Sequence, residues 1–176
     1  MQILISCAKT MAAASDIALP AATEAPFRAE AEQTALQLAT LTTDELARLL
    51  RVNRTIAAEN RRRYLHFHDT PLLPAIAAYT GVVFKHIDPA GFSTDDFAYA
   101  QQHLNITSFL YGLLRPLDAI RSYRLEGDVV LPGEECSAFD FWRARLTDGL
   151  LDAIRALLPP EDYRLLCRIT LEGATH

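Results

Sequence analysis

"FLYGLLRPLDAIRSYRLEG", residues 109–127, is the stretch of the sequence that constrains the fold most strongly. It places three arginines, two acidic residues, a proline and two glycines among apolar residues. Gly112 has no Cβ, so the backbone there can come close to a phosphate or to another segment of the chain. Arg115, three residues later, adds a fork of hydrogen-bond donors that suits phosphate. A hairpin that holds phosphate is therefore one interpretation of this stretch.

A buried turn tied by ion pairs is the other interpretation. Arg115, Asp118, Arg124 and Glu126 could form partly buried pairs that hold the turn together. The two interpretations are compatible, because one arginine can brace a loop and still face a cleft. Helix–hairpin–helix modules hold duplex DNA in a similar way, through phosphate contacts that position the protein without reading sequence. The match is loose, because Leu114 stands where such hairpins usually carry a second glycine.

The bulk composition indicates one cytoplasmic domain over residues 1–176. Half of the residues are hydrophobic and 22% are charged, which is ordinary for a globular protein. The net charge of −5 excludes a protein that is basic overall, but it allows a local basic face. Three widely spaced cysteines without a zinc pattern indicate reduced thiols. We expect no membrane partner, because no stretch approaches the ~20 apolar residues of a membrane span, and we expect no cofactor.

Periodicity and capping residues divide the chain into strands and helices. Thr42 with Glu45 forms a capping-box pattern, Ser93 with Asp96 marks another helix start, and Asn53 can cap a helix. The predicted helices cover residues 27–39, 42–52, 53–64, 93–104 and 138–158, with a short helical piece from residue 82. The predicted strands cover residues 2–6, 75–79, 105–109, 123–125 and 163–171. Residues 110–114 are predicted to be helical or tightly turned.

Because these strands and helices are interleaved irregularly, the expected fold is a single compact domain of the α+β or mixed α/β class, not a regular doubly wound sheet. The predicted strand at residues 163–171 is followed by only five residues. A buried strand as the last element suggests a chain that stops before its fold is complete.

Polar residues follow the first predicted strand, where α/β proteins often bind ligands. These are Ser6, Lys9 and Thr10, in a segment that lacks the glycines of a phosphate loop. Lys9 could lower the pKa of Cys7 and make a reactive thiolate. We prefer the interpretation that Cys7 packs as a small, half-buried apolar residue and that Lys9 is the functional one.

Two further groups of side chains have both functional and structural interpretations. The first contains Arg48, Arg51, Arg54, Arg61, Arg62 and Arg63, with Glu59 as the one acid among them. Such a series can neutralise phosphates, or it can be a solvated helix face, and the sequence favours neither.

The second group is "HFHD", residues 66–69. His66 and His68 would point the same way in a strand and, with Asp69, could bind iron or zinc. A histidine pair without metal is the preferred interpretation, because His86 and His103 are isolated.

Five segments, in their order and spacing, resemble the bacterial YaaA peroxide-stress family. They read ILISCAKT, YTGVVFK, FSTDDFAYAQQHL, LYGLLRPLDAIRSYRLE and FDFWRARLTDGL. The resemblance covers the chain from Met1 to about Leu151 and is most specific in the fourth segment.

The resemblance implies a cytoplasmic protein with a compact mixed α/β fold and a helix–hairpin–helix-like element. It also implies a positively charged cleft that binds DNA, and protection from hydrogen peroxide by lowering free iron. The site residues that it implies are Ser6, Lys9, Thr10, Gly81, Lys85, Tyr111, Gly112, Leu113, Leu114, Arg115, Pro116, Asp118, Tyr123, Arg124 and Glu126.

The chain also departs from the family pattern. Cys7 stands where a proline is more usual, and "GDVVLPG" follows Glu126 where a methionine and a glycine are more usual. Members of the family usually continue past residue 171 with a strand-rich, basic segment, so we expect this chain to lack that segment.

Three hypotheses follow. In the first, Lys9, Lys85, Arg115 and Arg124 converge on a basic cleft that binds double-stranded DNA without reading its sequence. In the second, the protein is an enzyme for a small phosphorylated or nucleotide-like anion, with Glu126 as general acid or base. In the third, His66, His68 and Asp69 bind iron directly. The first, which requires no enzymatic activity, is preferred, and the oligomeric state stays open.

Overall fold

The protein has a mixed α/β fold built from two small sheets and surrounding helices, as seen in a computed structural model that describes residues 2–155. The predicted strand at residues 163–171 lies outside the described residues. The strands are β1 (Ile3–Ser6), β2 (Thr23–Glu24), β3 (Leu73–Pro74), β4 (Leu104–Ser108), β5 (Gly112–Leu114) and β6 (Asp118–Ile120). The helices are α1 (Arg28–Ala39), α2 (Thr43–Leu49), α3 (Arg54–Leu65), α4 (Ala75–Ala78), α5 (Val82–Ile87), α6 (Thr94–His103) and α7 (Ala138–Arg155), with short 3-10 turns η1 (Phe67–Asp69) and η2 (Pro89–Gly91).

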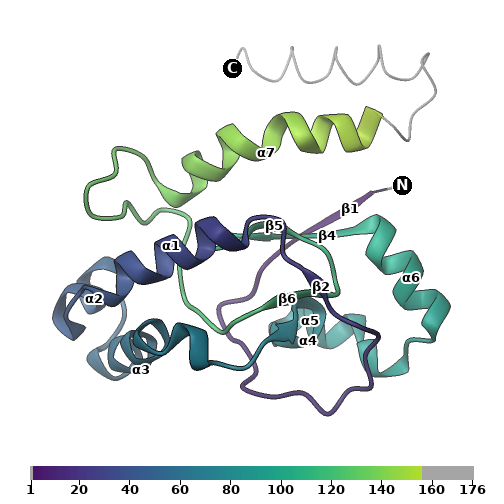
Figure 1. Ribbon diagram of the computed structural model, residues 1–176, viewed down its shortest axis with the longest axis horizontal. Coiled ribbons are helices and arrows are strands. Elements are labelled where there is room, and N and C mark those ends of the chain that lie inside the picture. The colour runs from purple at the N-terminus through teal and green to yellow at the C-terminus, as the bar shows by residue number, and fades with distance from the viewer. Residues whose placement is uncertain (1, 156–176) are drawn as a thin grey trace.

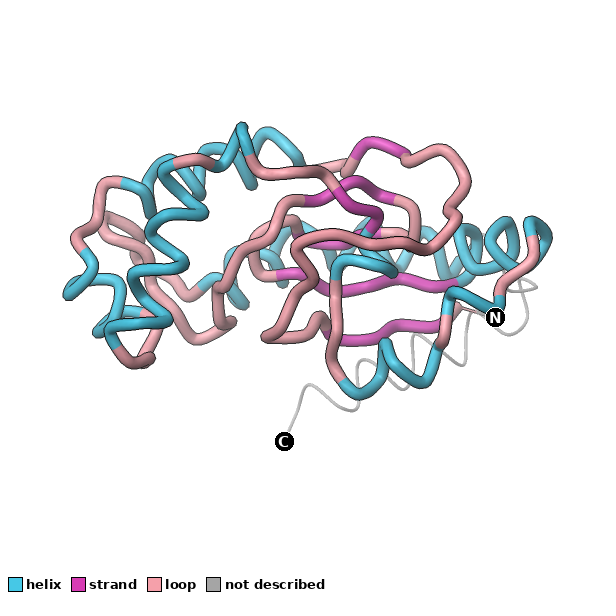
Figure 2. The backbone as a smooth tube through the Cα atoms, turned by 90° about the horizontal axis from the view of Figure 1, so that it is seen from below, coloured by secondary structure: helices cyan, strands magenta, loops and turns pink. Residues whose placement is uncertain are grey.

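The helices surround the two sheets unevenly. Figure 1 shows α1, α2 and α3 at one end of the molecule, α6 at the other, and α7 crossing above the strands. In Figure 2 the strands of both sheets lie to one side of the helical end formed by α2 and α3. The strand orders are β1-β4-β5 in one sheet and β2-β6-β3 in the other. The predicted fold class is therefore confirmed.

The register of the β1-β4-β5 sheet determines where the sequence motifs lie. β1 runs parallel to β4, with Ser6 opposite Thr107, and β4 runs antiparallel to β5, with Ser108 opposite Gly112. The Ser108 hydroxyl accepts hydrogen bonds from the backbone N–H groups of Leu110 (3.3 Å) and Tyr111 (2.9 Å), which closes a tight turn. Residues 110–114 were expected to be helical or tightly turned: residues 110–111 do lie in the tight turn, whereas Gly112–Leu114 form β5. The helix–hairpin–helix-like element is not confirmed.

Local signals located most helices correctly. Thr42 with Glu45, and Ser93 with Asp96, each make both hydrogen bonds of a capping box, at the start of α2 and of α6. The Asn53 side chain accepts from the backbone of Ile56 and caps α3. Each cap satisfies backbone donors that the first helical turn leaves unpaired.

Two short predicted strands were wrong. Residues 75–78 form α4, a buried single turn, and the neighbouring β3 pairs with β6 instead. Residues 123–125 lie outside the named strands. The carbonyl of Arg124 accepts a hydrogen bond from the Tyr64 hydroxyl, not from a neighbouring strand. His66 ends α3, and His68 belongs to η1, so the two histidines do not alternate along a strand.

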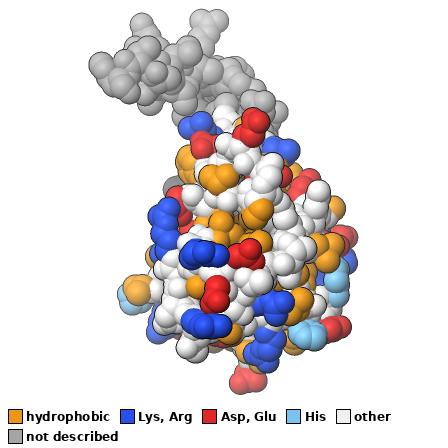
Figure 3. Space-filling view, turned by 90° about the vertical axis from the view of Figure 1, so that its left-hand side faces the viewer, with side chains coloured by type: hydrophobic (Ala, Val, Ile, Leu, Met, Phe, Trp, Pro, Cys, Tyr) orange, Lys and Arg blue, Asp and Glu red, His pale blue; other side chains and the backbone are white. Residues whose placement is uncertain are grey.

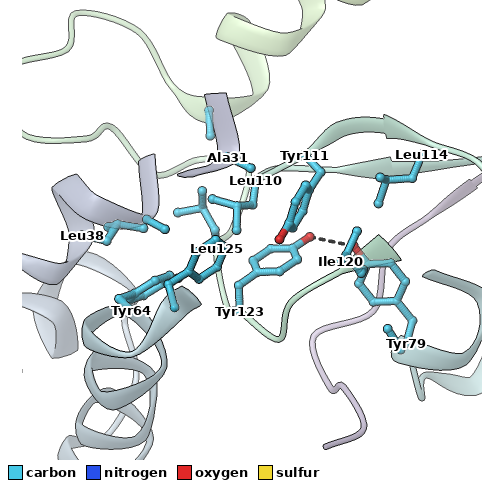
Figure 4. Packing of buried hydrophobic residues seen from close by; sticks show 14 of the residues in the cluster. Ala31, Leu38, Tyr64, Tyr79, Leu110, Tyr111, Leu114, Ile120, Tyr123 and Leu125 are labelled. Carbon is cyan, nitrogen blue, oxygen red and sulfur yellow. Dashed lines mark hydrogen bonds between the residues drawn. The ribbon is translucent and has the colours of Figure 1, made fainter. Parts of the chain in front are cut away.

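A group of buried tyrosines joins the sheets to the helices (Figure 4). The Tyr123 hydroxyl lies 2.9 Å from that of Tyr79 and 2.8 Å from the Ser108 hydroxyl. Burial raises the pKa of Tyr79 and of Tyr123 well above the ordinary value, so both stay neutral and act as hydrogen-bond donors and acceptors.

Within residues 2–155, none of the helices combines the length and the apolar character needed to cross a bilayer.

Candidate functional site

Two adjoining pockets form a charged cleft beside the end of β1. The inner pocket, about 80 Å³, is lined by Ser6, Cys7 and Tyr123 among others, and the outer pocket measures about 210 Å³. Lys9, Arg124 and Glu126 line both pockets, and Arg51 and Asp128 line the outer one. We call this feature, defined by Lys9, Arg51, Arg124, Glu126 and Asp128, the Lys9 cleft.

Three cations and two carboxylates meet in the Lys9 cleft. Glu126 lies between two cations, 3.1 Å from the Lys9 amine and 3.1 Å from the Arg124 guanidinium. At the outer edge Arg51 pairs with Asp128. The Arg124 Nε is buried and has no hydrogen-bond partner among the described residues. The cleft therefore has one positive charge in excess.

Segments far apart in the sequence bring these charges together. Lys9 follows β1, and Arg51 follows α2 in a left-handed backbone conformation (φ +51°) that turns the chain toward α3. Residues 121–126 return from β6, held by the hydroxyls of Tyr64 and Tyr123. Gly81 lets the start of α5 approach the loop after β1, because a Cβ there would stand 2.7 Å from the Cβ of Ala8.

Cys7 lines the inner pocket. Burial raises the pKa of its thiol, and a hydrogen bond with Tyr123 opposes this effect without cancelling it. The thiol therefore stays protonated at neutral pH, which fits the preferred interpretation of Cys7 as a half-buried apolar residue.

Arg115 does not line either pocket of the Lys9 cleft. Its guanidinium lies 3.7 Å from Asp118, whose fully buried carboxylate also accepts hydrogen bonds from the Arg115 backbone (2.7 Å) and the Thr23 hydroxyl (2.6 Å). The sheet register explains why Arg115 lies apart from Lys9. β5 runs antiparallel to β4, from Gly112 opposite Ser108 to Leu114 opposite Ile106, and so leads away from the end of β1. For Arg115 the geometry fits the ion-paired turn, and Arg124 is the arginine that joins Lys9.

Gly112 is covered by side chains of the protein itself. A Cβ at this position would lie 2.6 Å from Trp142 and 3.1 Å from Phe27, and φ is +72°. The Trp142 indole also donates a hydrogen bond of 2.9 Å to the carbonyl of Phe109. The missing Cβ therefore allows α7 to approach the hairpin. The neighbouring Tyr111 and Leu114 are buried as well.

The other residues implied by the resemblance have different positions. Ser6 lines the inner pocket, and the carbonyl of Thr10 accepts a hydrogen bond from the backbone of Thr80. Lys85 is exposed on α5 and lines neither pocket of the Lys9 cleft, and Leu113 is half-buried on β5. The sequence analysis missed Arg51 and Asp128 as partners, because their pairing joins positions 77 residues apart.

The arginine series does not form one basic face. Asn53 separates α2 from α3, so the series is divided between the α2 segment and α3. Arg54 pairs with Asp44 at 3.3 Å, and Arg63 pairs with Glu59. Figure 3, which faces the α2–α3 end, shows positive and negative side chains intermixed. Arg51 is the member of the series that reaches the Lys9 cleft.

The HFHD segment does not assemble a metal site. His66 lies 3.4 Å from Asp69, while the ring of His68 packs edge-on against Phe67. Within the described part of the chain, no group of three or more His, Cys, Asp or Glu side chains is placed to hold a metal ion.

The sequence was compared with protein families and with curated proteins. A family model described as "Peroxide stress protein YaaA" matches residues 1–165. A UPF0246 protein of Bacteroides thetaiotaomicron is 56% identical over 160 residues, which cover 89% of this chain and 62% of that protein. Relatives in Porphyromonas gingivalis and Crocosphaera subtropica are 48% and 35% identical over 88% and 85% of this chain, and 62% and 60% of their own lengths. The chain thus spans 60–62% of the length of these curated relatives.

Proposed function

The chain belongs to the peroxide stress protein YaaA family, and from that premise we propose that it acts in peroxide stress by binding double-stranded DNA in the Lys9 cleft. The cleft holds backbone phosphates and does not read the base sequence. Protein bound in this way lowers the damage that iron and peroxide do to DNA.

The observation that carries this proposal is the meeting of Lys9, Arg51 and Arg124 from three separate segments of the chain. Lys9 and Arg51 are 69% and 76% exposed, so a duplex can reach them. The Arg51–Asp128 pair is exposed on both sides and is worth only about 0–1 kcal/mol, so phosphate oxygens can replace Asp128 as the partner of Arg51. Contacts of this kind position a protein on DNA but carry no sequence information.

Binding of a fluorescently labelled mixed-sequence duplex, followed by anisotropy, tests the proposal. Lys9→Ala and Arg51→Ala together should weaken binding roughly tenfold or more, because each removes a charge-assisted hydrogen bond. Arg143→Ala is the matched control: Arg143 is also exposed and paired with an acid, Asp140 at 3.1 Å, but it lies on α7. Equal affinities of the double variant and the wild type would refute the proposal.

The iron part of the proposal has its own test. Plasmid DNA exposed to ferrous iron and peroxide should be nicked less when wild-type protein is bound. The Lys9→Ala/Arg51→Ala variant should give little protection. If it protected as well as the wild type, protection would not depend on DNA held in the cleft.

A small phosphorylated or nucleotide-like substrate is a second candidate ligand. It is favoured by the inner pocket, which Glu126 lines and which, at about 80 Å³, is too small to admit a duplex. Glu126, 22% exposed between two cations, would serve as general acid or base while Lys9 and Arg124 hold the anion. Glu126→Gln separates the two functions: it should abolish turnover of a substrate but leave DNA binding as tight as in the wild type, or tighter, because one negative charge is lost.

A further inference from the structure

A second pocket, distinct from the Lys9 cleft, lies between α1 and the β2-β6-β3 sheet. Its volume is about 190 Å³, and it shares no lining residue with the Lys9 cleft. Arg121 and Tyr111 form its polar wall, and Arg28 and Glu32 approach it from α1. We call it the Arg121 pocket.

Arg121 carries a buried charge that has no ion-pair partner among the described residues. The residue is only 9% exposed, and no carboxylate in residues 2–155 lies within ion-pair distance of its guanidinium. One Nη donates to the carbonyl of His68 at 3.2 Å, and the guanidinium carbon lies 5.6 Å from the centre of the Phe67 ring. Its Nε is buried without a partner in the same part of the chain. Buried arginines are normally paired, so this one has donors available for an anion.

The acids of the pocket are already engaged by a different arginine. Glu32 accepts a hydrogen bond from Arg28 at 2.7 Å, and Glu24 lies 3.4 Å from the same guanidinium. The hydrogen bond from Arg28 lowers the pKa of Glu32, so this carboxyl group stays ionised. Glu32 also interacts electrostatically with Arg121, but its hydrogen bond goes to Arg28, so the Arg121 guanidinium has no carboxylate within ion-pair distance among the described residues.

Tyr111 supplies a second donor beside Arg121. Its hydroxyl oxygen accepts a hydrogen bond of 3.0 Å from the backbone N–H of Arg121. Burial raises the pKa of this hydroxyl to about 12, so it keeps its proton at neutral pH. The hydroxyl therefore keeps a hydrogen that it can donate to a ligand in the pocket that Tyr111 lines.

We propose that the Arg121 pocket binds the carboxylate of a small aliphatic molecule, with Arg121 and Tyr111 as donors. Arginine presents two parallel N–H groups to a planar carboxylate. Ala25, Leu72 and Ala119 line the same pocket and pack against the hydrocarbon part. A monoanion suits the site better than a phosphate dianion, because the two carboxylates beside Arg28 repel each added negative charge. This site is independent of the DNA proposal.

Calorimetric titration and thermal unfolding with butyrate test the assignment, using butyramide as the neutral control of the same shape. Butyrate should bind and raise the melting temperature, whereas butyramide and inorganic phosphate should do neither at the same concentration. Comparable binding of butyramide, or tighter binding of phosphate, would overturn the assignment.

Two variants place the ligand in the pocket. Arg121→Met should weaken butyrate binding at least tenfold while leaving the free protein as stable as the wild type, since an unpaired buried charge is lost. Tyr111→Phe, which keeps the ring, should weaken binding several-fold and serves as the second variant. Lys9→Ala/Arg51→Ala should bind butyrate as the wild type does. Undiminished butyrate binding in either pocket variant would refute the proposal.

Discussion

Replacing Gly112 with alanine should strongly destabilise the fold. The backbone there has φ +72°, a conformation that costs a residue with a Cβ about 1–2 kcal/mol. The new Cβ would stand 2.6 Å from the Trp142 ring, and relieving such a clash costs about 1–3 kcal/mol more. The expected loss in the free energy of unfolding is therefore about 2–5 kcal/mol.

Gly133→Ala is the matched control for the clash. Gly133 also has a positive φ, +85°, but a Cβ there meets nothing within 4 Å. This variant should lose only the conformational part, about 1–2 kcal/mol. Urea unfolding of both variants and the wild type, followed by tryptophan fluorescence, gives the difference directly.

Equal destabilisation by the two alanines would refute the reasoning. It would mean that Trp142 does not cover Gly112, and that the hairpin backbone is open to a ligand. The hairpin with Gly112 and Arg115 would then be the better candidate for the binding surface.

Three more perturbations test other parts of the fold. Raising the pH above about 10 should lower stability, because the side chain of Tyr111 ionises near 10 in the unfolded protein and near 12 in the folded one. The unfolded state therefore loses its proton first, and urea unfolding should show a loss of about 1.4 kcal/mol per pH unit across this range from Tyr111 alone. A flat profile would contradict this expectation. Ser93→Ala should cost about 1 kcal/mol in thermal unfolding by removing the cap of α6, with Ser93→Asp restoring most of it, and an unaffected alanine variant would show that the cap is unimportant. Asp118→Asn should cost about 1–3 kcal/mol in urea unfolding, because the Asp118 carboxylate braces the Arg115 turn. The affinity for DNA should stay unchanged. A matching loss of DNA affinity would show that this turn supports the binding surface.

Local sequence signals predicted the parts of the fold that depend on neighbouring residues. The caps at Thr42, Asn53 and Ser93 were correct because a helix start is decided within four residues. Residues 75–79, expected as a strand, and residues 112–114, expected as helical or tightly turned, were misassigned because short apolar runs fit a strand or a helix turn equally well. Their conformation depends on partners elsewhere: β3 and β6 beside α4, and β4 beside β5.

The candidate site was predicted in part for the same reason. Lys9, Arg124 and Glu126 were identified from their motifs, and the fold brings them together. Arg115 was expected at the same place, but the antiparallel register of β5 takes it away. Asp128 could not be recognised, because its contact with Arg51 exists only after α2 packs near the segment that follows Glu126.

The salt dependence of DNA binding is the most direct test of the central claim. If Lys9, Arg51 and Arg124 each neutralise one phosphate, the logarithm of the association constant should fall with the logarithm of salt concentration with a slope of about −2.7. Lys9→Ala/Arg51→Ala should reduce the slope to about −0.9, while Arg143→Ala should leave it at the wild-type value. A slope that is the same in all three proteins would contradict the account, because the phosphates would then be held somewhere other than the Lys9 cleft.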